Sequence, residues 1–122
     1  MPKCIVIDTS SIIFGFSHMV NIFDSIQNTM PDCTMVASIG ILRELSGIGH
    51  STKRSSPYAN VGLVQVLKRC RVIKDNSSVD SWITKYSIKH NCSVCTNDIE
   101  LKQKLKDKGI STYSISKNGT LR

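Results

Sequence analysis

Lys3-Cys-Ile-Val-Ile-Asp8-Thr9-Ser10 is an apolar run that ends on a carboxylate followed by two hydroxyl side chains. Four apolar residues in a row, three of them β-branched, are typical of a strand covered on both faces, such as a central parallel strand. Open α/β folds place their ligand crevice at the carboxyl ends of such strands. We therefore expect Asp8 to lie at that edge and to take part in the chemistry of the protein.

Further apolar runs along the chain alternate with segments of helical spacing. The runs at residues 33–38, 70–74, 92–96 and 110–115 are predicted as strands. Strands separated by helices indicate right-handed crossovers and a parallel sheet. The predicted fold class is α/β, a three-layer α/β/α sandwich with a five-stranded parallel sheet, formed by a single domain over residues 1–122.

The first two crossovers each contain an extra helical segment. Returning to the start of the next parallel strand needs only one helix. Residues 11–17 and 39–48 are therefore expected near the carboxyl edge of the sheet, where they would wall a groove.

Composition favours a cytoplasmic protein without a membrane partner. A chain of 122 residues can bury a core of its own. No run of about 18 apolar residues is present, and the Met-Pro-Lys start lacks the apolar segment of a signal peptide. An odd number of cysteines in such a chain predicts free thiols in a reducing compartment. These are Cys4, Cys33, Cys70, Cys92 and Cys95.

The net charge of +7 favours a polyanionic partner, nucleic acid before membrane. Arg43, Lys53 and Arg54 are the candidate RNA-binding residues, because they lie on or after a segment expected to wall the groove. Trp82, at helical core spacing, is expected to pack in the interior rather than stack on a base. No glycine-rich phosphate loop follows the first strand, which excludes dinucleotide and P-loop sites.

Acidic residues follow the ends of the predicted strands. The six are Asp8, Glu44, Asp75, Asp80, Asp98 and Glu100. Carboxylates that meet in one groove repel each other unless cations neutralise them, so the cluster indicates a metal site. Without a neighbouring set of His and Cys ligands, the expected cofactor is Mg²⁺ or Mn²⁺, which can activate a water for phosphodiester hydrolysis. Acids in the first turn of a helix are also favoured by the helix dipole, which is the alternative for Asp80, Asp98 and Glu100.

Four segments together resemble the motifs of the PIN-domain nucleases. They are Ile5-Val-Ile-Asp8-Thr9-Ser10, Ile41-Leu-Arg-Glu44-Leu, Ser78-Val-Asp80 and Cys95-Thr96-Asn97-Asp98-Ile-Glu-Leu. The last is similar to an archaeal branch related to ribosomal-RNA processing nucleases and VapC-type toxins. The resemblance implies that Asp8, Glu44, Asp80 and Asp98 are catalytic and that Asp8, Asp80 and Asp98 bind the metal. It also implies that Ser10 and Thr96 are supporting hydroxyls, with Asp75 and Glu100 left to capping or surface roles.

As an activity, the resemblance implies metal-dependent hydrolysis of single-stranded RNA, in ribosomal-RNA processing or as a toxin. The implied partners are single-stranded RNA, a second copy of the chain, and an antitoxin or a pre-ribosomal particle. Many relatives carry a second acid directly after the third-motif aspartate, where this chain has Ser81. That departure leaves open an alternative, a non-catalytic RNA-binding or assembly module with the same fold.

Overall fold

The computed structural model describes residues 2–122 and has the predicted three-layer α/β/α architecture. Its elements are β1 (Cys4–Ile7), α1 (Thr9–Ser17), α2 (Ile22–Thr29), β2 (Thr34–Ser38), α3 (Ile39–Gly49), α4 (Ser56–Arg69), β3 (Arg71–Ile73), α5 (Val79–His90), β4 (Ser93–Cys95), α6 (Ile99–Asp107) and β5 (Thr112–Tyr113). The strands form one parallel sheet of five, in the order β3-β2-β1-β4-β5. No helix of this part of the chain has the length and apolar character needed to cross a bilayer.

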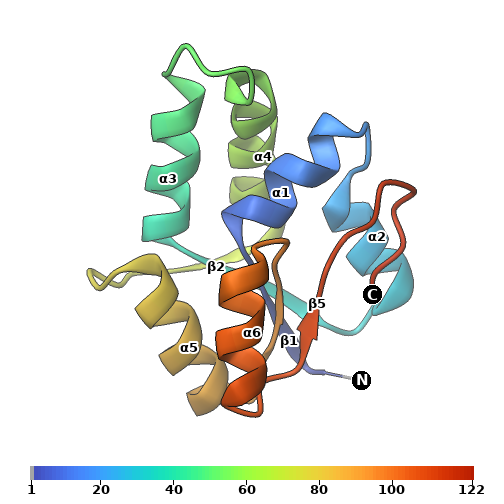
Figure 1. The fold of residues 1–122 in the computed structure, drawn as a ribbon, viewed down its shortest axis with the longest axis vertical. Helices are drawn as coiled ribbons and strands as arrows, with labels where there is room; N and C mark the ends of the chain where they lie inside the picture. Colours follow the sequence, from blue (N-terminus) through green and yellow to red (C-terminus); the bar gives the residue numbers. More distant parts are fainter. Residues whose placement is uncertain (1) are drawn as a thin grey trace.

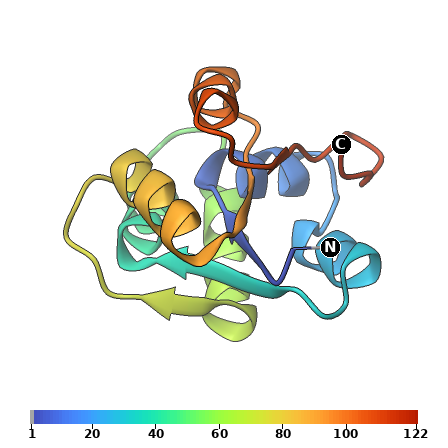
Figure 2. The ribbon, with the colours of Figure 1, turned by 90° about the horizontal axis from the view of Figure 1, so that it is seen from below.

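Helices cover both faces of the sheet. From β1 the chain moves outward to β2 and β3, then returns across β1 to β4 and β5. Right-handed crossovers therefore place α1 to α4 on one face and α5 and α6 on the other. Figure 1 shows α1, α3 and α4 in its upper part and α5 and α6 in its lower part, with β2 between them. In Figure 2, seen from below, β2 passes in front of α4.

Strand β1 is the centre of the core. Ile5, Val6 and Ile7 are all fully buried, because the strand pairs with β2 on one side and β4 on the other and is covered by helices on both faces. Helices α1, α3 and α6 begin just after β1, β2 and β4 end. Their amino termini consequently gather at the carboxyl edge of the sheet, next to the start of α5 (Figure 1).

Local boundaries differ from expectation at the last strand and its preceding helix. Strand β5 is only Thr112–Tyr113, shorter than the predicted 110–115. The sequence Asn97-Asp-Ile-Glu100 predicts a capping box in which Asn97 caps α6, and this prediction is wrong. Asp98 is the N-cap. The side chain of Asn97 instead accepts from Ile115 N at 3.0 Å and donates to Ile115 O at 2.9 Å.

Two cysteines form a disulfide, Cys4 with Cys92, contrary to the expectation of five free thiols. The register of β1 and β4 pairs Ile5 with Ser93, which places the two cysteines side by side with Cα atoms 4.8 Å apart. Strand pairing is a long-range property that the spacing of cysteines does not reveal. The free thiols are Cys33, Cys70 and Cys95.

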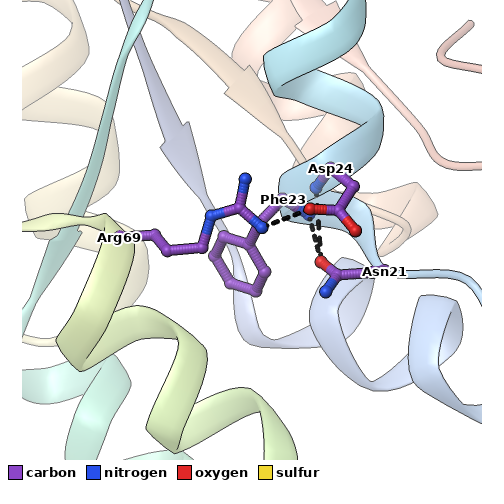
Figure 3. A network of polar contacts seen from close by, with 4 residues as sticks. All are labelled: Asn21, Phe23, Asp24 and Arg69. Atoms are coloured by element: carbon purple, nitrogen blue, oxygen red, sulfur yellow. Dashed lines mark hydrogen bonds and ion pairs between the residues drawn. The ribbon is translucent and has the colours of Figure 1, made fainter.

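An ion pair joins two helices, α2 and α4, that cover the same face of the sheet. Arg69, at the end of α4, lies 2.5 Å from the Asp24 carboxylate in the first turn of α2 (Figure 3). Asn21 caps the same turn by accepting from the backbone N–H groups of Phe23 and Asp24. Because the Asp24 side chain is 60% exposed, water screens the pair, which contributes at most about 1 kcal/mol.

Two helical glycines give a matched test of packing on the α1–α3–α4 face. A methyl group on Gly62 of α4 would overlap the buried Ile12 side chain, whereas one on Gly47 of α3 would meet no atom within 4 Å. We expect Gly62→Ala to lower the free energy of unfolding by about 1–3 kcal/mol. Gly47→Ala should raise it by up to about 1 kcal/mol, because alanine is the better helix former. Urea unfolding measures both, and equal effects of the two substitutions would contradict this packing.

The disulfide predicts a redox-dependent stability. It closes a loop of 88 residues, and chain entropy gives such a cross-link about 4–5 kcal/mol at most. Reductant should therefore lower the free energy of unfolding of the native chain and leave that of Cys4→Ser unchanged. Thiol titration of the denatured protein should count three free thiols before reduction and five after it. A count of five without reductant would show that the disulfide is absent.

Candidate active site

A cavity of about 530 Å³ opens at the carboxyl edge of the sheet and brings the four predicted acids together. Its acidic lining is Asp8, Glu44, Asp80 and Asp98. The remaining lining residues are Thr9, Ser10, Ile13, Arg43, Gly47 and Ile48, which come from α1 and α3. The two extra helical segments therefore wall the site, as the sequence predicts.

Asp8 is the most deeply buried acid of the cavity, with 6% of its surface exposed. It follows β1, and its carboxylate oxygen Oδ2 accepts from Ser10 Oγ at 2.7 Å and from Thr96 Oγ1 at 2.8 Å. Burial raises the pKa of Asp8, and the nearby charge of Asp80 raises it further, while the two hydroxyl hydrogen bonds act in the opposite direction. The site thus holds a carboxylate whose ionised form is poorly solvated.

Ser10 and Thr96 are oriented by backbone amides at the start of α6. Ser10 Oγ accepts from the N–H of Asn97 at 3.0 Å, and Thr96 Oγ1 accepts from the N–H of Asp98 at 3.1 Å. Each hydroxyl carries one proton, and both protons are directed at Asp8. The two hydroxyl oxygens lie 3.1 Å apart, but no proton remains for a hydrogen bond between them.

Glu44 lies on α3, and a hydroxyl from α1 holds it in place. Thr9 Oγ1 donates to Glu44 Oε1 at 2.8 Å. Partial desolvation raises the pKa of Glu44, and the charges of Asp8 and Asp80 add to the shift. The carboxylates of Asp8 and Glu44 therefore interact electrostatically across the cavity.

The other two acids of the cavity come from helix starts on the far face of the sheet. Asp80 lies in the first turn of α5, two residues after the N-cap residue Ser78. Asp98 caps α6, where its Oδ1 accepts from Leu101 N at 3.1 Å. Both side chains are exposed to solvent. The helix dipole favours acids at these positions, so capping and lining the cavity are compatible roles.

The acids of the cavity have no cationic partner. Among residues 2–122 the only ion pair joins Arg69 to Asp24. Within the same residues no three Asp, Glu, His or Cys side chains lie close enough together to hold one ion. Mg²⁺ needs fewer protein ligands than that, because it commonly binds one or two carboxylates and keeps several waters. The donor set, carboxylates without His or Cys, fits Mg²⁺ or Mn²⁺.

Four residues considered from the sequence do not line this cavity. Lys53 and Arg54 lie in the loop between α3 and α4, and of the candidate RNA-binding residues only Arg43 reaches the lining. Asp75 accepts hydrogen bonds from the backbone N–H and the hydroxyl of Ser77, which lower its pKa. Glu100 is exposed in the first turn of α6.

The structure also adds a cavity residue that sequence reasoning missed, Thr9, which binds Glu44. Within the two segments predicted to wall the groove, it identifies Ile13, Gly47 and Ile48 as the lining residues. Helical spacing could have found the wall, because Ile13 follows Thr9 by four residues and Ile48 follows Glu44 by four. Residues four apart lie on one face of a helix, so neighbours of a site residue at this spacing belong to the same wall.

Comparison with known proteins gives one consistent match. Residues 5–117 match the family described as a PIN like domain. Ribonuclease VapC9 of Archaeoglobus fulgidus is 23% identical over 108 residues, which cover 88% of this chain and 79% of that protein. The structure of the PIN domain endonuclease Utp24 is similar with a TM-score of 0.81 and 21% identity, covering 99% of this chain and 92% of that one. VapBC2 from Rickettsia felis, bound to a DNA fragment from its promoter, matches with a TM-score of 0.66 and 14% identity over 93% of this chain and 99% of that one.

The buried charge of Asp8 predicts a stability effect in metal-free buffer. Because the pKa of Asp8 is raised, its ionised carboxylate destabilises the folded state. This penalty is absent below the unfolded-state pKa of 3.8, and it grows as the pH rises from there through the folded-state pKa. Asp8→Asn keeps an acceptor for Ser10 and Thr96 and should raise the free energy of unfolding, increasingly from about pH 4 upward. The control Asp24→Asn, which removes the exposed partner of Arg69, should lower it slightly. A destabilised Asp8→Asn variant in EDTA would refute this reading.

Proposed function

The chain belongs to the family of PIN-like domains, and on that basis we propose that it is a divalent-metal-dependent ribonuclease that hydrolyses single-stranded RNA. The observation that carries the proposal is the gathering of Asp8, Glu44, Asp80 and Asp98 around one cavity without a neutralising cation. The net charge of +7 supports a polyanionic substrate. The names of two relatives, a ribonuclease and an endonuclease, support cleavage.

In the proposed mechanism Asp8, Asp80 and Asp98 would hold Mg²⁺ or Mn²⁺, with one or two of these carboxylates binding an ion directly and waters filling its other positions. The bound ion supplies a water of lowered pKa and neutralises charge on the phosphate. Ser10 and Thr96 fix the carboxylate of Asp8, since their hydroxyl protons both point at its Oδ2. Arg43 contacts a phosphate beside the cleaved bond.

Glu44 is the proposed base that orients the attacking water. Its hydrogen bond from Thr9 leaves the second carboxylate oxygen free to accept, and its raised pKa brings its proton affinity closer to that needed by a base near neutral pH. The water oxygen bonds to phosphorus and the bond to the 3′ oxygen breaks. Glu44 accepts one proton of the water, and the released 3′ oxygen takes up a proton from solvent, so the products carry a 5′-phosphate and a 3′-hydroxyl.

The proposed setting is ribosomal-RNA processing or the role of a VapC-type toxin. In ribosomal-RNA processing the partner would be a pre-ribosomal particle, and in the toxin role it would be an antitoxin. A homodimer is compatible with both settings. Lys53 and Arg54 are proposed to contact RNA outside the cavity, from the loop between α3 and α4. Comparing cleavage of precursor ribosomal RNA with that of transfer RNA separates the two settings.

A second candidate is a non-catalytic RNA-binding or assembly module. Two observations favour it: Ser81 stands where many relatives have an acid, and no three ligating side chains within residues 2–122 are close enough to share an ion. Such a module would bind intact RNA and leave it intact at every Mn²⁺ concentration. Metal-dependent cleavage excludes this candidate.

The nuclease proposal predicts which acids matter. Asp8→Asn, Glu44→Gln, Asp80→Asn and Asp98→Asn should each lower the cleavage rate of single-stranded RNA in Mn²⁺ by about a hundredfold or more, because each removes charge that organises the reacting groups. Glu100→Gln and Asp107→Asn remove acids outside the cavity and should keep the native rate. Cleavage is followed by gel electrophoresis of end-labelled RNA. Equal activity of the two groups of variants would contradict the assignment.

A further inference from the structure

A second cavity, of about 280 Å³, lies between the end of the edge strand β3 and the face of α5 that carries Trp82. It is lined by Ile73, Asp75, Trp82, Lys85, Tyr86, Lys89 and His90, and we call it the α5 groove. None of its residues lines the catalytic cavity. The two cavities share one element, because Asp80 in the first turn of α5 faces the catalytic cavity and Trp82, two residues later, lines the groove.

A row of three rings runs along the α5 groove. Trp82, Tyr86 and His90 stand four residues apart, so they lie on one face of the helix. The ring centroids of Trp82 and Tyr86 are 5.0 Å apart, and those of Tyr86 and His90 are 4.3 Å apart. Trp82 is 3% exposed and forms the floor, whereas Tyr86 is half-buried and His90 is exposed. Neighbouring rings of the row are tilted by 34° to each other, and the row deepens toward Trp82.

Four polar side chains of the α5 groove, the two lysines and the two ring donors, lack partners within residues 2–122, whereas Asp75 is held by Ser77. Lys85 and Lys89 are exposed and form no ion pair with any residue of the described chain. Across residues 2–122, neither the indole N–H of Trp82 nor the phenolic O–H of Tyr86 takes part in a hydrogen bond. The groove thus combines two lysines without an ion pair, two free donors and an aromatic row with the single carboxylate of Asp75, which leaves a net positive charge suited to single-stranded nucleic acid.

We propose that the α5 groove binds a segment of single-stranded RNA next to the catalytic cavity. A base packs against the exposed His90 end of the aromatic row, and the flanking phosphates contact Lys85 and Lys89. Because α5 carries both Asp80 and the groove, a strand that lies in the groove enters the catalytic cavity past the first turn of the helix. The groove would then position RNA, while the carboxylates act on it.

RNA explains the side chains of the groove better than a peptide does. A peptide that adds to the edge strand β3 would use its backbone groups and would not need Lys85 or Lys89. The lysines face outward beside the rings, which suits a ligand that alternates negative charges with flat bases. This inference shares the RNA partner with the proposed function but does not depend on cleavage.

The test measures binding without cleavage, in EDTA, with an oligouridylate of about 12 nucleotides. Trp82 is the only tryptophan of the chain, so its emission reports on the groove directly. We expect the oligonucleotide to quench that emission. Lys85→Gln with Lys89→Gln should weaken binding about tenfold and reduce the slope of log K against log salt by about 1.4, as expected for two lost phosphate contacts on a single strand.

The matched control is Lys104→Gln with Lys106→Gln, which removes the same charge from two exposed lysines of α6. It should leave the quenching unchanged and weaken binding only slightly. Unchanged Trp82 emission, or equal losses of affinity in the two double variants, overturns the inference. If the protein never cleaves RNA but shows the quenching and the dependence on Lys85 and Lys89, only the nuclease proposal is refuted. If cleavage requires Asp98 but both binding effects are absent, only the groove inference is refuted.

Discussion

The burial of the Asp8 carboxylate at the end of the central strand is the constraint on which the rest of the site depends. An ionised carboxylate removed from water destabilises a fold unless hydrogen bonds or a cation compensate it. Ser10 and Thr96 supply the hydrogen bonds, and their own oxygens are held by backbone amides at the start of α6. Within the described chain no basic side chain forms an ion pair with Asp8, and burial keeps its pKa raised. In the proposed function, Mg²⁺ or Mn²⁺ compensates this charge.

The topology makes the convergence of the other acids a consequence of where β1 lies. With β2 and β4 as its neighbours, the helices that follow these three strands begin at the same edge. Glu44 reaches the cavity from α3, Asp98 from the start of α6, and Asp80 from the first turn of α5, the helix that connects β3 to β4. Asp8 and Asp98, which are 90 residues apart in the sequence, can therefore share one cavity. The sheet positions the acids, and the helix starts stabilise them.

The features that were predictable from the sequence are those encoded locally. The apolar run ending at Asp8 identifies a buried parallel strand, and the motifs around Glu44, Asp80 and Asp98 support a resemblance that the family match confirms. The alternation of strands and helices is likewise local and fixes the α/β class.

Features that depend on pairing between distant segments could not be predicted. The disulfide of Cys4 and Cys92 follows from the register of β1 with β4, which no spacing encodes. Asn97 has the sequence context of a cap, yet its side chain binds Ile115, which the fold brings alongside. The groove beside Trp82 likewise depends on the edge strand β3 packing next to α5. Helical spacing identifies Trp82 as buried but does not reveal the unpaired lysines around it.

The most direct test of the central claim is a crystal structure of the protein soaked in Mn²⁺, with the ion located by its anomalous scattering. The account predicts a peak in the cavity, within ligand distance of the Asp8 carboxylate and of at least one of Asp80 and Asp98. The same crystals of Asp8→Asn should lose the peak. A cavity that stays empty at Mn²⁺ concentrations that occupy other surface sites, or a peak unaffected by Asp8→Asn, would contradict the account.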